Sequence, residues 1–142
     1  MRAELSTGDG FAPVACVPPQ PGIARVLLVE DSMLIALDGE DALRACGVGQ
    51  VAIAGNVAAA LAAIAEDLPD FAVLDFNLGD ESSEAVARAL AEAGVPYCFA
   101  TGYGDALDRV HVSPPYGVLK KPYSQKDLSE VLARFEADRA VP

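Results

Sequence analysis

The stretch VLLVED at residues 26–31 places an apolar run directly before two carboxylates. Runs of similar length and composition recur along the chain, at Val51–Ala54, Phe71–Leu74, Tyr97–Ala100 and Gly117–Leu119. Short apolar runs without polar alternation are typical of strands buried on both faces of a parallel sheet. We therefore expect five buried strands, of which Val26–Val29 is the first.

Stretches of helical length and composition separate these runs. The expected helices are Ser32–Cys46 with Gly39 inside it, a helix capped by Asn56 that carries Leu61, Ile64 and Leu68, one with Val86 and Leu90 that stops at Gly94, a short one over Asp105–Val112 that Pro114-Pro115 ends, and a last one after Ser124. In the last helix Ser124 and Asp127 have the spacing of a capping box. Leu128, Val131, Leu132 and Phe135 then follow on one face. Five strands, each followed by a helix, predict a doubly wound α/β domain with a parallel sheet covered on both faces.

Polar residues follow four of the five runs. Glu30 and Asp31 follow the first, Asp75 the third, Thr101 the fourth and Lys121 the fifth, whereas only Gly55 and Asn56 follow the second. Ligands of open α/β sheets bind beyond the carboxyl ends of the strands. If the second strand lies at the edge, in the order 2-1-3-4-5, the other four strands are contiguous and deliver these residues to one crevice. Strand alternation points Lys120 away from it.

These residue types suit the transfer of a phosphoryl group. Carboxylates packed together raise one another's pKa, and a divalent cation reverses that effect. Hard oxygen ligands select Mg²⁺ over softer metals. Lys121 adds a positive charge and Thr101 a hydroxyl donor. A nucleophilic oxygen, a metal, a cation and a hydrogen-bond donor are the parts that stabilise a transferring phosphoryl group.

In order and spacing, these motifs resemble the receiver, or CheY-like, domains of response regulators. The resemblance covers residue 25 to about residue 138 and implies a flavodoxin-like (βα)5 sandwich. It implies phosphorylation of Asp75 from the phosphohistidine of a histidine kinase or phosphotransferase. It further implies that Asp31, Asp75 and the backbone carbonyl of Asn77 ligate Mg²⁺, that Glu30 acts through water, and that Thr101 and Lys121 contact the phosphoryl oxygens.

A longer motif narrows the resemblance. Residues 96–104 read PYCFATGYG, which is similar to the motif of the FAT GUY receivers. That subgroup works with kinases of the HWE or HisKA_2 type in general stress signalling. Many receivers carry an aromatic switch residue three positions before the lysine, where this chain has Val118. Thr101, Tyr103 and Tyr116 are therefore the expected switch or modulatory residues.

Composition limits the functions that are compatible with the chain. Its net charge of −11, with scattered basic residues, argues against nucleic-acid binding. No apolar run is long enough for a membrane span, and the first residues do not resemble a signal peptide. The odd cysteine count, Cys16, Cys46 and Cys98, has no metal-ligand spacing. We expect a cytoplasmic protein that is a monomer or a weak dimer.

The first 22 residues are rich in Gly and Pro and are expected to be a flexible leader or linker, with the receiver domain over residues 23–142. The sequence ends shortly after the last helix, so we expect output by protein–protein contact, or a role as a phosphate sink. We expect no enzymatic activity beyond self-phosphorylation and self-dephosphorylation.

Three alternatives stay open or are discounted. The chain could be a receiver excised from a hybrid histidine kinase, with residues 1–22 as the inter-domain remnant. It could also be a pseudo-receiver that scaffolds protein binding without phosphorylation, although Asp75, Thr101 and Lys121 argue against this. A haloacid-dehalogenase-like phosphatase would need an aspartate where this chain has Asn77, and is discounted.

Overall fold

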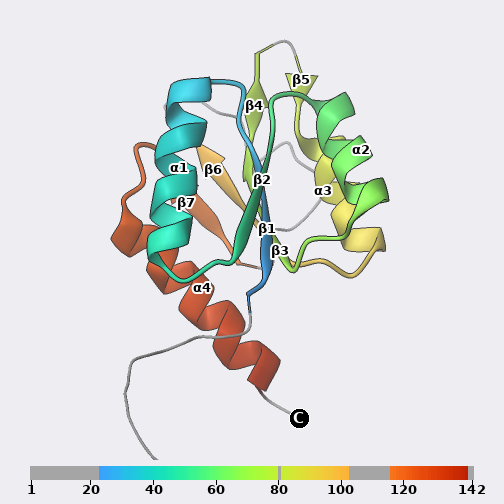
Figure 1. The fold of residues 1–142 in the computed structure, drawn as a ribbon. Helices are drawn as coiled ribbons and strands as arrows, with labels where there is room; N and C mark the ends of the chain where they lie inside the picture. The colour runs from blue at the N-terminus through green and yellow to red at the C-terminus, as the bar shows by residue number, and fades with distance from the viewer. Residues whose placement is uncertain (1–22, 80, 103–115, 141–142) are drawn as a thin grey trace, which may run out of the picture.

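The protein has a parallel β-sheet of five strands with helices on both faces (Figure 1). The structure is a computed structural model and describes residues 23–79, 81–102 and 116–140. The sheet has the order β2-β1-β3-β6-β7, and its strands are β1 (Arg25–Val29), β2 (Gln50–Ala54), β3 (Phe71–Asp75), β6 (Tyr97–Thr101) and β7 (Val118–Lys120). This order confirms the predicted 2-1-3-4-5 arrangement and the flavodoxin-like α/β fold.

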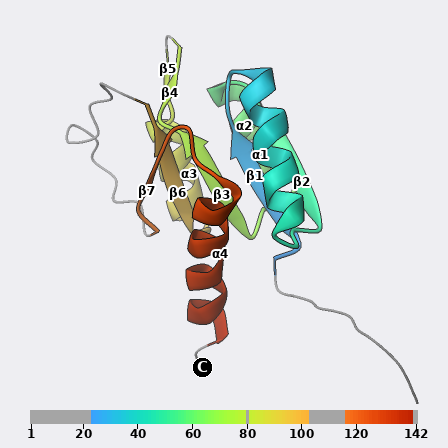
Figure 2. The same ribbon diagram turned by 90° about the vertical axis from the view of Figure 1, so that its left-hand side faces the viewer.

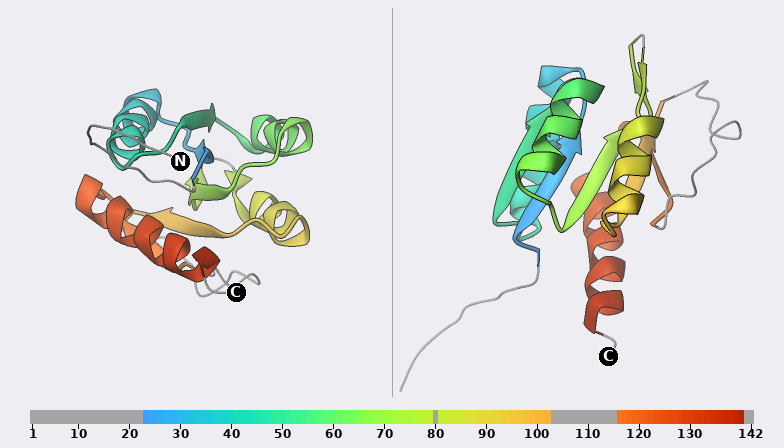
Figure 3. Two further views of the ribbon diagram at one scale, coloured as in Figure 1. Left: turned by 60° about the horizontal axis from the view of Figure 1, so that its bottom comes forward. Right: turned by 90° about the vertical axis from the view of Figure 1, so that its right-hand side faces the viewer.

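The four described helices form two layers (Figure 3). They are α1 (Met33–Ala45), α2 (Val57–Glu66), α3 (Glu84–Glu92) and α4 (Gln125–Ala140). One core cluster joins α1 and α4 to one face of the sheet, around Leu28, Phe71 and Leu128. The other joins α2 and α3 to the opposite face, around Leu27, Leu74 and Leu90. β3 and β6 are buried throughout, as their continuous apolar runs predict.

Local capping explains where the helices begin and end. Asn56 Oδ1 accepts a hydrogen bond from Ala59 N at 2.8 Å, which starts α2. Ser124 and Asp127 exchange the two hydrogen bonds of the expected capping box, at 2.9 and 3.1 Å. Gly94 follows α3 with φ 76°, the left-handed conformation that glycine tolerates. The sequence therefore specifies these helix ends locally.

One expectation about the helices is wrong. Leu68 does not belong to α2, because the helix ends at Glu66 and Asp67 is extended with φ −159°. Pro69 follows, and the residue before a proline is sterically excluded from the helical region. Leu68 is instead 52% exposed. The short helix expected over Asp105–Val112 lies outside the described residues.

A small hairpin that the sequence did not reveal projects beyond the sheet (Figure 2). Its antiparallel strands are β4 (Asn77–Leu78) and β5 (Glu81–Ser82), and they lie between β3 and α3 in the chain. Figure 1 shows it at the end of the sheet where β1 and β3 finish. None of the helices within the described ranges is sufficiently long and apolar to cross a membrane.

Candidate functional site

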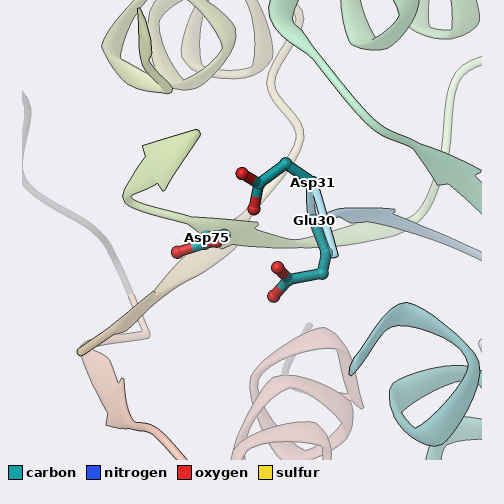
Figure 4. Close-up of side chains that lie close together, drawn as sticks. All are labelled: Glu30, Asp31 and Asp75. Carbon is teal, nitrogen blue, oxygen red and sulfur yellow. The ribbon is translucent and has the colours of Figure 1, made fainter. Parts of the chain in front are cut away.

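The carboxyl ends of β1 and β3 bring three carboxylates together (Figure 4). These strands are paired in parallel, with Val29 opposite Leu74, so the residues that follow emerge side by side. Glu30, Asp31 and Asp75 each offer an oxygen atom, and these atoms all lie within 4.8 Å of one another. Glu30 is 3% and Asp75 5% exposed, whereas Asp31 faces solvent.

Lys121, which directly follows the edge strand β7, also reaches this cluster. Its Nζ lies 2.9 Å from Glu30 Oε1 and 3.1 Å from Asp75 Oδ2. The backbone positions it, because Lys121 N donates to the Thr101 carbonyl at 2.8 Å just after β7 ends. Burial opposes the charge of Lys121, but hydrogen bonds to Glu30 and Asp75 outweigh it and raise the pKa of Lys121. Lys120 is exposed, as strand alternation predicts.

The electrostatics of the cluster centre on Asp75. The pKa of Asp75 is raised to about 6, mainly by burial; the hydrogen bond from Lys121 opposes this shift, and the negative charge of Glu30 contributes to it. Asn77 N donates to Asp75 Oδ1 at 3.4 Å, and Ser32 N donates to Glu30 Oε2 at 3.1 Å. One lysine is thus the only cation among the described residues that pairs with these carboxylates.

The donor set fits a hard divalent cation. An open groove of about 340 Å³ lies over the carboxylates, and its lining includes Glu30, Asp31, Ser32, Asp75, Asn77, Gly79 and Lys121. Two carboxylates with carbonyl and water oxygens are a typical Mg²⁺ environment. The positive charge of such an ion would stabilise the ionised form of Asp75. The residues present therefore fit Mg²⁺.

The structure treats the expected switch residues differently. Thr101 ends β6 and is 6% exposed. Thr101 is not among the lining residues of the groove, whereas its neighbour Gly102 is. Tyr103 lies outside the described residues. Tyr116 lies in a cluster with Phe71 and Phe135, at centroid distances of 5.6 and 5.8 Å, and its hydroxyl donates to Asp138. Because Phe71 begins β3 and Asp75 ends it, Tyr116 lies at the other end of the sheet from the groove.

A second cavity, which the sequence did not predict, lies beside the first. It has a volume of about 370 Å³ and lies between α1 and the residues after β7, with Ile35, Gly39, Lys121, Pro122 and Tyr123 in its lining. Ile35 and Lys121 line both cavities, so the two are neighbours. Burial raises the pKa of Tyr123 to about 12, and the charge of Glu30 contributes in the same direction. The signal in the sequence was the glycine inside an otherwise regular helix.

Comparison with known proteins places this architecture among solved structures. A scan against protein-family models gives no match. A search of curated proteins gives none either. Among solved structures, SdrG from Sphingomonas melonis Fr1 is 37% identical, with a TM-score of 0.65, and the match covers 78% of this chain and 94% of SdrG.

Two further solved structures share the fold. The PhyR response regulator REC domain from Erythrobacter litoralis is 24% identical, with a TM-score of 0.74 over 85% of this chain and 95% of that domain. A response regulator receiver domain protein from Clostridium thermocellum is 21% identical, with a TM-score of 0.72 over 82% of this chain and 97% of that one.

Proposed function

This chain belongs to the receiver domains of response regulators, and we propose that it accepts a phosphoryl group on Asp75 from the phosphohistidine of a histidine kinase, in a Mg²⁺-dependent reaction. The observation that carries the proposal is the convergence of Glu30, Asp31 and Asp75 with Lys121 at one edge of the sheet. A structural aspartate would not need two further carboxylates and a half-buried lysine around it.

Asp75 is the nucleophile of the proposed transfer. Its carboxylate oxygen forms the new P–O bond, the P–N bond of the phosphohistidine breaks, and the imidazole nitrogen keeps the electron pair. Asp31, Asp75 and the Asn77 carbonyl would hold Mg²⁺ directly, and Glu30 would act through water. A bound Mg²⁺ supplies charge neutralisation on the phosphoryl oxygens.

Lys121 and Thr101 complete the proposed machinery. Lys121 Nζ already contacts Asp75 Oδ2, so it lies within reach of oxygens on a phosphoryl group attached there. Thr101 ends the neighbouring strand β6, which pairs with β3 so that Ala100 lies opposite Asp75. We assign the Thr101 hydroxyl as a donor to a phosphoryl oxygen. A cation and an oriented donor stabilise the charge that spreads over the transferring group.

Labelling with a small phosphodonor tests the assignment. The wild-type chain, incubated with acetyl phosphate and Mg²⁺, should gain the mass of one phosphoryl group, and Asp75→Asn should gain none. Chelation of Mg²⁺ should abolish labelling of the wild type. A folded wild-type chain that does not label under these conditions would instead support the scaffold role of a pseudo-receiver.

The first half of α1 offers a surface for the kinase. Met33, Leu34 and Leu37 are 61%, 79% and 46% exposed, which is unusual for large apolar side chains on one helix. Ile35, in the same turn, lines the groove over Asp75. A phosphohistidine must enter that groove, so a donor domain there would cover this apolar surface. We propose that the donor packs an apolar face on Met33–Leu37.

The finer identity of the partner rests on the motif at residues 96–104. Its similarity to the FAT GUY receivers supports a kinase of the HWE or HisKA_2 type and a role in stress signalling. Phosphotransfer profiling against kinases of several classes tests this, with Asp75→Asn as the negative control. Preferential transfer from another class would contradict it.

Receiver domains are signalling modules, and self-phosphorylation and self-dephosphorylation are the only enzymatic steps that we propose. Output would follow through contact with a downstream protein, as a monomer or weak dimer. A receiver from a hybrid kinase would use the same site, and the gene around this sequence distinguishes the two.

A further inference from the structure

The hairpin β4–β5 forms part of the phosphorylation groove. Asn77 and Gly79 line the groove, and Asn77 N donates to Asp75 Oδ1. Gly79 has φ 76°, and a Cβ atom built on it would lie 3.7 Å from Asp31 Oδ2. Gly79 therefore lies beside one proposed Mg²⁺ ligand, Asp31, while β4 before it provides another in the Asn77 carbonyl.

Such a hairpin is too small to hold its shape alone. Each strand has two residues, paired as Asn77 with Ser82 and Leu78 with Glu81. Even longer isolated two-stranded hairpins are marginally stable in water. Its position must therefore come from contacts with the rest of the domain.

Two contacts provide this support. Leu78 is 6% exposed and packs in the core cluster beneath α2 and α3. On the next strand, Glu81 Oε1 accepts a hydrogen bond from Val57 N, the first residue of α2, at 3.1 Å. A carboxylate at a helix N-terminus also interacts favourably with the helix dipole. Glu81 thus ties the hairpin to an element that contributes no ionisable side chain to the groove.

We propose that Glu81 is a positioning residue for Mg²⁺ binding, because its bond to the start of α2 holds the hairpin over Asp31 and keeps the Asn77 carbonyl in place. This inference rests on the proposed function of the Asp75 groove. Without the bond, Asp31 and Asp75 stay where β1 and β3 put them, but the hairpin carrying Asn77 gains freedom. Residues that orient the ligands of a metal affect its affinity without touching it.

The matched control lies on the same helix. Asn56 caps α2 through Ala59 N, so Asn56→Ala weakens the same helix end without loosening the hairpin. Glu81→Gln keeps an oxygen that can accept from Val57 N and removes only the charge. Glu81→Ala removes the acceptor. Glu81 is exposed, so these variants leave the core unchanged.

The experiment is a Mg²⁺ titration of the isotope-labelled full chain, followed by the amide signals of Asn77 and Gly79. We expect Glu81→Ala to bind Mg²⁺ about three- to tenfold more weakly than wild type, and Glu81→Gln and Asn56→Ala to bind within about twofold of it. The thermal unfolding temperatures of Glu81→Ala and Asn56→Ala should fall by similar amounts, because each variant loses one helix cap.

Each outcome decides between the proposals. Equal affinity of wild type and Glu81→Ala overturns the role of Glu81 and leaves the proposed function intact. Equal weakening in Glu81→Ala and Asn56→Ala also overturns it, because the effect then follows helix stability. The proposed function fails together with this inference if the wild type does not bind Mg²⁺, or if Asp31→Asn binds it as tightly as the wild type.

Discussion

Two rims of one groove are built in opposite ways. The hairpin rim, formed by β4 and β5, is held by the buried Leu78 and by the hydrogen bond from Val57 N to Glu81. The α1 rim, Met33–Leu37, presents large apolar side chains to solvent. A hydrogen-bonded backbone keeps ligand atoms in position. Exposed apolar surface instead favours binding of a partner, because covering it removes it from water. The difference matches the roles that we propose for the two rims, metal binding at the hairpin and docking of the phosphodonor at α1.

The largest expected effect comes from Lys121, the charged residue that lines both cavities. Lys121→Ala removes the cation between Glu30 and Asp75 and leaves two buried carboxylates unpaired. We expect labelling of Asp75 by acetyl phosphate to slow by about 100-fold or more, because a charge that stabilises the transfer is lost. Lys120→Ala, one residue away and exposed, is the control. Equal rates in the two variants would show that Lys121 does not contact the phosphoryl group.

The free energy of unfolding depends on pH through Asp75, a proposed Mg²⁺ ligand. Its pKa is raised from 3.8 to about 6, mainly by burial, so the folded chain holds this proton more tightly than the unfolded chain. The resulting stabilisation is complete below about pH 4 and is lost as the pH rises through about 6. Without Mg²⁺, Asp75→Asn should therefore raise the free energy of unfolding by about 1–2 kcal/mol at about pH 7.5, after allowance for solvent screening.

Urea denaturation with and without Mg²⁺ checks this sign. The advantage of Asp75→Asn should shrink below about pH 4, where the wild-type carboxyl is protonated, and Mg²⁺ should stabilise only the wild type near neutral pH. Asp41→Asn, at an exposed position of α1, is the control. An Asp75→Asn variant that is less stable than wild type near neutral pH without Mg²⁺ would contradict the raised pKa of Asp75.

The α1 rim can be tested apart from the chemistry. Leu34 is 79% exposed, and Leu34→Ser should slow phosphotransfer from a cognate histidine kinase about tenfold, because apolar contact area with the donor is lost. Labelling by acetyl phosphate, which needs no docking surface, should change by less than about twofold. Leu61→Ser, at a 38% exposed leucine of α2, is the matched variant and should affect neither rate. If both serine variants slow the kinase equally, the α1 surface is not the docking site.

The smallest effect is expected from the glycine beneath the α1 rim. A Cβ on Gly39 would lie 2.9 Å from Leu28 Cδ2 and 3.1 Å from the Tyr123 hydroxyl oxygen. Overpacking costs about 1–3 kcal/mol and the better helix propensity of alanine returns about 1, so Gly39→Ala should lower stability by about 1 kcal/mol. Mg²⁺ affinity should not change, because the hairpin rim is untouched. A loss of Mg²⁺ affinity would show that the two rims are coupled.

Much of the site follows from local sequence. Each strand has an apolar run that ends at a polar residue, and parallel pairing brings those ends to one edge, so Glu30, Asp31, Asp75 and Lys121 could be assembled from the sequence. Lys121 could be chosen over Lys120 because strand residues alternate. The end of α2 was misjudged at Leu68, since apolar periodicity continued past the point where Pro69 stops the helix.

The hairpin could not be predicted in this way. Asn77–Ser82 has no apolar alternation long enough to indicate strands, and Leu78 is buried because it packs in one core cluster with residues of α2 and α3. The bond from Val57 N to Glu81 spans 24 residues of sequence, and neither residue type suggests the other as a partner. Such pairings depend on how the whole chain packs.

The sequence by itself determined the order of the elements, the helix caps and the set of chemical groups at the sheet edge, because these depend on neighbouring residues and on the alternation of strands. Only the tertiary structure decided that Lys121 pairs with both Glu30 and Asp75, that Tyr116 packs far from the groove, and that Glu81 ties the hairpin to α2. The physical reason is distance along the chain: a hydrogen bond or ion pair between remote residues forms only where packing has already brought them together.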